Sequence, residues 1–183
     1  MASMGKLLSS LRSGDEHSAW NHPGLMAPER IRVSSQDFDD GGRIPLTYSG
    51  KGVGDNISPQ LAWTGAPEDS AQLLLIIEDT DVPLPRPALH TIALLEPFHS
   101  SLPVGGLDPK TEGLVFLPAT LWRRGYQGPR PLPGHGLHHY GFCLWALATR
   151  ISKPTDIKNF AMLLDRTSGT AIARGRLIGL QER

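Results

Sequence analysis

The chain has 183 residues, with 18 Lys and Arg against 18 Asp and Glu, seven His and one Cys. This length fits one domain with short tails, large enough to bury a core without disulfides or metals. A formal net charge of zero argues against nucleic acid and anionic membranes as partners, because clustered Lys and Arg usually meet both. The single cysteine, Cys143, excludes an internal disulfide and any multi-cysteine metal site, and it fits a cytoplasmic location.

Glycine and proline are abundant: 20 Gly and 16 Pro make up about a fifth of the chain, against a usual share of about 12%. This composition favours a turn-rich, mostly β protein. Residues 1–28 are predicted to be a partly ordered leader, followed by a single domain over residues 29–183. Polar residues interrupt the short leucine cluster of the leader, so neither a signal peptide nor integral membrane association is expected.

In chain order, alternating apolar residues over 31–35 predict a strand, and the turn at 39–42 leads into a second strand at 44–48, which together form a hairpin. Further strands are predicted at 61–63, 72–78, 89–95, 113–117, 137–149 and 171–180. The run at 72–78 is apolar at nearly every position, which indicates a central strand covered on both faces. One helix is predicted at 155–165, with Thr155 as its N-cap and Gly169 as its stop.

Polar groups stand at the ends of three apolar strands. Because side chains alternate along a strand, Asp79 and Asp81 should share a face, and so should His138 and Tyr140, with His139 on the opposite side. The same alternation aligns His90 with Ile92 and Leu94. If these strands are neighbours, two carboxylates, two imidazoles and a phenol converge beside the loop at 125–136. The glycines of that loop would allow its backbone to approach a ligand closely.

Each of these groups also has an ordinary structural interpretation. An Asp-x-Asp pair before a proline-rich loop is typical of a capped turn, and a lone His90 is typical of a strand end. A metal site at His135, His138 and His139 is disfavoured because the last two side chains diverge on a strand. We find no nucleophile elbow, phosphate-binding loop or dinucleotide fingerprint, so we expect no cofactor and no metal.

Taken together and in order, seven segments resemble the phosphatidylethanolamine-binding protein family, in its bacterial and archaeal Raf-kinase-inhibitor-like branch. The segments are FDDGGRIP at 38–45, NISPQLAW at 56–63, DTDVP at 79–83, His90, GYQGP at 125–129, GLHHY at 136–140 and ARGRLIG at 173–179. The resemblance spans about residues 31–181. It departs from the family at Thr80, where a proline is usual, and at Leu89, where an aromatic often precedes the pocket histidine.

The resemblance implies a mostly β fold with a large central antiparallel sheet, a smaller second sheet and a few peripheral helices. It also implies a small pocket for an anionic group such as phosphate, phosphoethanolamine, phosphotyrosine or carboxylate. Carried over by motif, the ligand-binding residues are Asp79, Asp81, Pro83, His90, Gly128, His138 and Tyr140. Imidazole, phenol and loop N–H groups would be the donors to the anion, and Asp79 would orient a histidine or accept from an ammonium group.

The leading hypothesis is therefore a non-catalytic binding protein with a small anionic ligand, and by analogy a regulator of protein partners such as kinases. The first alternative is a hydrolase in which an Asp-His pair acts as general base, although no nucleophile is identifiable. The second is an interaction module that works through homodimerisation, with Leu7, Leu8, Trp20 and Trp122 as its apolar surface.

Overall fold

The computed structural model describes residues 4–183, which form two sheets and two α-helices. The large sheet has six strands in the order β2-β9-β8-β4-β5-β7. Its strands are β2 (Gly42–Arg43), β4 (Gln72–Asp79), β5 (Ala88–Leu95), β7 (Leu114–Phe116), β8 (His138–Leu147) and β9 (Ala171–Gln181). All its ladders are antiparallel except that of β2 with β9, so the sheet is mixed at one edge.

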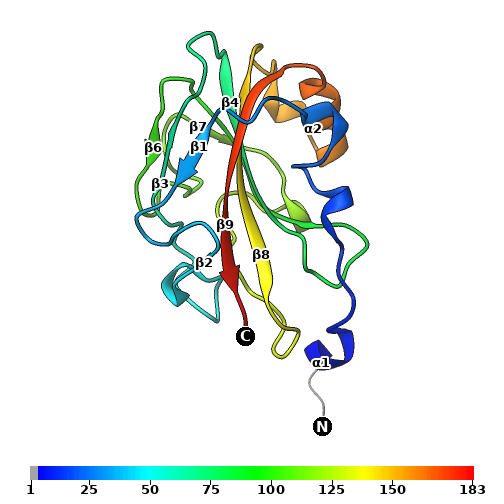
Figure 1. Cartoon of the computed structure of the whole chain (residues 1–183). Helices are drawn as coiled ribbons and strands as arrows, with labels where there is room; N and C mark the ends of the chain where they lie inside the picture. Colours follow the sequence, from blue (N-terminus) through cyan, green and yellow to red (C-terminus); the bar gives the residue numbers. More distant parts are fainter. Residues whose placement is uncertain (1–3) are drawn as a thin grey trace.

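The small sheet consists of β1 (Arg32–Ser34), β3 (Leu61–Thr64) and β6 (Ser101–Leu102). It lies on one face of the large sheet, while α2 (Phe160–Thr167) and the N-terminal part of the chain lie on the other (Figure 1). The short helix α1 (Met4–Leu8) lies beyond the end of the sheet where β8 begins and β9 ends (Figure 1). The predicted mostly β fold with two sheets and few helices is confirmed.

Two apolar cores flank the large sheet because its central strands are buried on both sides. Every residue of β4 is buried, as expected for a strand covered on both faces. Leu73, Leu75 and Ile77 pack toward the small sheet, and Leu74 and Ile76 pack toward α2. The same alternation decides which polar side chains at the end of β4 reach each side.

The predicted hairpin of 31–35 with 44–48 is wrong. Residues Leu46–Tyr48 form a 3-10 turn, and β1 pairs with β3 instead. The N–H groups of Gly41 and Ile44 donate to Ile178 and Leu180, so the chain after the turn lies along the edge of β9. Pro45 follows at once and has no N–H to extend a ladder.

The predicted helix at 155–165 begins too early. Residues Pro154–Asp156 form a 3-10 turn, and the N-cap of α2 is Asn159, whose side chain accepts a hydrogen bond from the Met162 N–H at 3.0 Å. This cap satisfies one of the N–H groups that a helix start leaves free. Gly169 follows the helix with a φ of 73°, the left-handed conformation that glycine adopts after helix ends. No helix of residues 4–183 is long and apolar enough to cross a membrane.

Candidate functional site

A carboxylate and an imidazole meet at the end of the two central strands. β4 and β8 are antiparallel neighbours with Asp79 opposite Tyr140, which brings Asp79 beside the start of β8. The Oδ2 atom of Asp79 lies 2.8 Å from Nδ1 of His138, and the two side chains are only 2% and 1% exposed. This buried pair faces the small sheet.

Tyr140 lies on the same face as His138, as strand alternation predicts, and is completely buried. Its ring stacks over that of His138 with centroids 6.3 Å apart, and it meets the ring of His90 edge to face at 5.3 Å. The Tyr140 hydroxyl makes no hydrogen bond that satisfies normal geometry with any residue from 4 to 183. Burial, together with the nearby Asp79 charge, raises the pKa of this phenol above its ordinary value.

The side chain of His90 reaches Tyr140 because of a β-bulge in the strand that carries it. The register of β4 with β5 shifts so that Ile77 pairs with Thr91 and Glu78 with Leu89, which leaves His90 as the extra residue. Its ring therefore turns toward Tyr140, and the prediction that it follows Ile92 and Leu94 is wrong, since those two pack toward α2.

The protonation of His90 is set by its surroundings. Its Nδ1 lies 2.7 Å from the Gln127 carbonyl oxygen, so Nδ1 must carry the hydrogen. Burial lowers the pKa of His90, which favours the neutral ring. Asp79, His90, His138 and Tyr140 are called the Asp79 cluster from here on.

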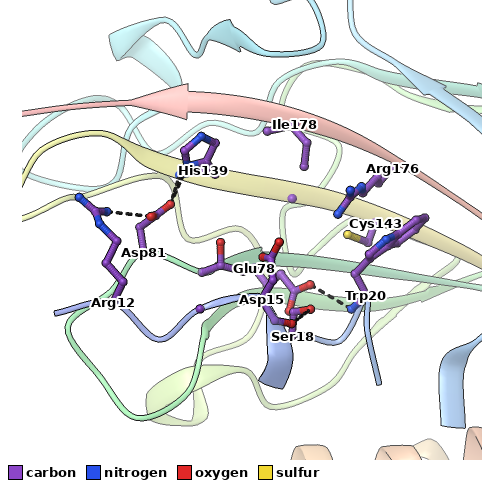
Figure 2. Close-up of a pocket in the computed structure, with 13 residues that line it drawn as sticks. Arg12, Asp15, Ser18, Trp20, Glu78, Asp81, His139, Cys143, Arg176 and Ile178 are labelled. Carbon is purple, nitrogen blue, oxygen red and sulfur yellow. Dashed lines mark hydrogen bonds and ion pairs between the residues drawn. The ribbon is translucent and has the colours of Figure 1, made fainter. Parts of the chain in front are cut away.

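Asp81 does not belong to the Asp79 cluster, although the sequence predicted that it shares a face with Asp79. β4 ends at Asp79, whose side chain accepts the Asp81 N–H at 2.8 Å and turns the chain. The Asp81 carboxylate lies between Arg12 and His139, at 2.8 Å from each side chain (Figure 2). Burial opposes its ionisation, but the hydrogen bonds from His139 and the charges of His139 and Arg12 lower the pKa of Asp81.

Gly128 is close-packed against the chain itself. Its N–H donates to Asn56 Oδ1 at 2.9 Å, so it is not free for a ligand in this conformation. A Cβ at this position would lie 2.3 Å from the Tyr48 carbonyl oxygen. The glycine is thus required by contact between two backbone segments. Pro83 lies half-buried in the loop after Asp81, and its peptide bond to Val82 is trans, like all those described.

The sequence interpretation missed the role of His135, which extends the buried pair. His135 Nδ1 lies 2.7 Å from His138 Nε2, and His135 Nε2 lies 2.9 Å and 3.1 Å from the carbonyl oxygens of Leu8 and Leu11. The side chain of His135 is buried. Three histidines within 135–139 are the available signal, but from the sequence His135 is considered only as a metal ligand. Within residues 4–183, no three His, Cys, Asp or Glu side chains are arranged to hold a metal ion.

The leader lies against the loops that flank the Asp79 cluster. The N–H groups of Ser13 and Gly14 donate to the Val82 and Thr80 carbonyls at 2.9 and 3.0 Å. Arg12 also donates to the carbonyl oxygens of Leu137 and His135, at 2.9 and 3.3 Å. Residues 1–3 of the predicted leader lie outside the described residues.

A cavity of about 410 Å³ opens on the other face of the sheet, beside Glu78, Trp20 and Arg176 (Figure 2). The buried Glu78 carboxylate accepts the N–H groups of Ala19 and Trp20 at 2.7 and 3.1 Å. Burial raises the pKa of Glu78 despite these hydrogen bonds. Glu78 thus anchors the leader and is separated from Asp79 by the sheet.

Comparison with known proteins identifies the family. The family model described as phosphatidylethanolamine-binding protein matches residues 34–182. A Mycobacterium tuberculosis protein named as lipoprotein LppC is 32% identical over 159 residues, which cover 85% of this chain and 74% of that protein. A UPF0098 protein of Pyrococcus abyssi is 32% identical over 160 residues, covering 85% and 86%.

A solved structure supports the same assignment. The crystal structure of a phosphatidylethanolamine-binding protein homolog from Chlamydia trachomatis superposes with a TM-score of 0.74 at 30% identity, covering 85% of this chain and 99% of that one. The sequence and the fold thus agree on one family over most of the chain. The chain belongs to the phosphatidylethanolamine-binding protein family.

Proposed function

We propose that the protein is a non-catalytic, cytoplasmic binding protein and that the Asp79 cluster takes a small anionic group such as phosphate, phosphoethanolamine, phosphotyrosine or carboxylate. The observation that carries the proposal is the Tyr140 hydroxyl, which is fully buried beside Asp79 and the Arg130 backbone but makes no hydrogen bond of normal geometry with residues 4–183. Leaving a buried hydroxyl unpaired costs about 1–3 kcal/mol. A ligand oxygen at this point would remove that cost.

The groups around the Tyr140 hydroxyl suit a ligand that carries an anionic group with an ammonium group beside it. Tyr140 donates O–H, and His90 donates a second N–H from Nε2 once it is protonated, because its Nδ1 is committed to Gln127. Asp79 is the adjacent acceptor and suits an ammonium group such as that of phosphoethanolamine. His90 is the only half-buried member of the Asp79 cluster, so ligand entry is expected beside it.

Hydrolysis is the less favoured function because of the position of His135. In an Asp-His general-base pair, the imidazole nitrogen remote from the carboxylate takes a proton from water. In this protein that nitrogen, His138 Nε2, lies 2.7 Å from His135 Nδ1 and is occupied. Turnover of simple esters or phosphoesters that is abolished by Asp79→Asn would overturn the non-catalytic assignment.

The proposed function also includes regulation of protein partners and a cytoplasmic location. Regulation of protein partners such as kinases follows from family likeness alone. A cytoplasmic location is supported by the single cysteine, which is buried and free. Cell fractionation tests the location directly, and recovery in the membrane fraction would contradict it.

Calorimetric titration with phosphoethanolamine and phosphotyrosine tests the binding role. We expect His138→Ala to weaken binding at least tenfold, and His139→Ala, one residue along on the opposite face, to change it less than twofold. Because removing a buried histidine could disturb folding, circular dichroism should accompany the titration, and Tyr140→Phe provides a second variant of nearly unchanged shape. Unchanged affinity in both His138→Ala and Tyr140→Phe would show that the anion does not bind at the Asp79 cluster.

A further inference from the structure

A second, larger hollow lies on the α2 face of the large sheet, away from the Asp79 cluster. It has a volume of about 600 Å³ and lies between residues 16–23, residues 86–89, residues 118–122 and the start of α2. Its volume falls within the range of about 300–1,000 Å³ that is usual for small-molecule sites. We call it the Trp122 groove.

The walls of the Trp122 groove are mostly apolar. Leu89, Phe160 and Leu164 line it and, partly buried, pack against the core between the sheet and α2, so its floor is continuous with packed hydrophobic side chains. Leu121 and Trp122 stand at its margin and are 71% and 78% exposed. An apolar molecule in the groove would cover these side chains and be stabilised by the area removed from water.

The backbone holds Leu121 and Trp122 at the groove in an unfavourable conformation. Their φ angles are 59° and 56°, in the left-handed region, which non-glycine residues rarely adopt. Thr120 fixes the segment to β5 by accepting the Leu89 N–H at 2.8 Å. The strained turn therefore presents two large apolar side chains to solvent.

The charges around the Trp122 groove are predominantly basic. Arg86 and Lys158 line it with two histidines, and the only acidic lining residue is Glu16. Arg86 is exposed and makes no hydrogen bond or ion pair with any residue of the described chain. Lys158 donates to the Thr155 carbonyl oxygen at 2.6 Å and keeps its charge near the groove.

We propose that the Trp122 groove binds a small amphipathic anion, an aliphatic chain or ring system that carries one carboxylate. The apolar part lies against Leu89, Phe160 and Leu164, and the carboxylate pairs with Arg86 and Lys158. A guanidinium and an ammonium that flank an apolar hollow match this class of ligand in both charge and polarity. The Trp122 groove is separate from the anion site proposed at the Asp79 cluster, because the two sites lie on opposite faces of the sheet.

Tryptophan fluorescence measures binding at the groove directly. Trp122 is exposed, whereas Trp20, Trp63 and Trp145 are at most 5% exposed. A ligand that covers the surface at the groove should therefore change the emission of Trp122 and not that of the buried tryptophans. Titration with octanoate and decanoate, below the concentrations at which they form micelles, should shift the emission to the blue. Decanoate should bind roughly tenfold more tightly, because two additional methylenes are buried. Decyltrimethylammonium, with the opposite charge, should not produce the shift.

Matched variants locate the site. Leu121→Asn and Leu121→Asp both suit the left-handed backbone, but only the second adds a negative charge. Leu121→Asp should weaken decanoate binding roughly fivefold more than Leu121→Asn does. Arg86→Gln should weaken it to a similar extent, while Arg32→Gln, an exposed arginine on β1, should not. Saturating phosphoethanolamine should leave decanoate binding unchanged.

The proposal is overturned if decanoate produces no shift, if the cationic amphiphile binds equally well, or if Arg86→Gln and Arg32→Gln behave alike. Competition between decanoate and phosphoethanolamine would instead place the carboxylate at the Asp79 cluster and also reject the groove. A third outcome would assign the groove to a second copy of this chain. In that case decanoate does not bind, the mass of the wild type doubles as protein concentration rises, and Leu121→Asp stays a monomer.

Discussion

His135 Nδ1 and His138 Nε2 lie 2.7 Å apart in the protein interior, and the directions of their hydrogen bonds can be assigned from the groups at either end. Carbonyl oxygens only accept, so His135 Nε2, which faces Leu8 and Leu11, must carry a hydrogen. The Asp79 carboxylate at the other end also accepts, so His138 Nδ1 must carry a hydrogen, and one further hydrogen lies between His135 Nδ1 and His138 Nε2. The leader and Asp79 thus fix the outer nitrogens of the two rings, His135 Nε2 and His138 Nδ1, as hydrogen-bond donors.

Histidine ¹⁵N NMR tests this assignment. We expect a protonated Nε2 on His135 and a protonated Nδ1 on His138 at neutral pH, because the first faces carbonyl oxygens and the second faces the Asp79 carboxylate. His17, which is exposed and outside the chain of hydrogen bonds, should show the tautomer mixture of a free imidazole. An unprotonated Nε2 on His135 would contradict the assignment.

The contact between α1 and His135 depends on a glycine. A Cβ on Gly5 would lie 2.2 Å from the Pro133 carbonyl oxygen and 2.7 Å from the His135 nitrogen, both of them backbone atoms that cannot easily move. Gly5→Val should therefore displace α1, and amide hydrogen exchange over residues 8–14 should become faster. Ser10→Val, at an exposed position of the same segment, is the control. Equal exchange rates in the two variants would show that Gly5 does not secure the leader.

The sequence predicts well the elements whose apolar pattern follows directly from their place in the large sheet. The apolar run of β4 identifies a doubly covered strand, and alternation in β8 places His138 and Tyr140 on one face. The errors occur where a group distant in sequence decides the geometry. The bulge turns His90 around, and Arg12 with His139 draws Asp81 away from Asp79. The leader shows no periodicity of its own because polar contacts to His135 and Glu78 hold it.

Glu78 should make a contribution to the stability of the folded protein that decreases as the pH rises. Its folded-state pKa is raised by burial, so the folded protein holds this proton more tightly than the unfolded chain does. The contribution of Glu78 to stability is fully present below its unfolded value of about 4.5 and is lost as pH rises through the folded pKa.

Urea unfolding of the wild type and Glu78→Gln between pH 4.5 and 7.5 measures this contribution. The stability of the wild type relative to the variant should be greatest near pH 4.5 and should fall toward pH 7.5. Comparison with the variant cancels the other titrating groups. A relative stability that rises with pH would mean that the hydrogen bonds from Ala19 and Trp20 outweigh burial.

His90 predicts the pH dependence of anion binding. Because its pKa is lowered by burial, the ring is neutral in the free protein at pH 7. A bound anion favours the charged ring, so binding takes up a proton and affinity should rise as pH falls toward about 6. Acetate is a suitable probe because it stays predominantly ionised from pH 5.5 to 8. Constant affinity across that range would rule out a role for His90 protonation.

The Tyr140 hydroxyl separates a ligand-binding role from a structural one. It is buried and makes no hydrogen bond of normal geometry with the described residues, so removing it in Tyr140→Phe should leave the free energy of unfolding unchanged or raise it by up to about 1 kcal/mol. The same substitution should weaken phosphoethanolamine binding by about tenfold, because one donor to the anion is lost. Tyr126→Phe is the matched control, since the Tyr126 hydroxyl donates to the Tyr48 carbonyl at 2.8 Å and its loss should destabilise the protein without weakening binding. If Tyr140→Phe destabilises the protein as much as Tyr126→Phe does and leaves binding intact, the Tyr140 hydroxyl serves the fold and not the ligand.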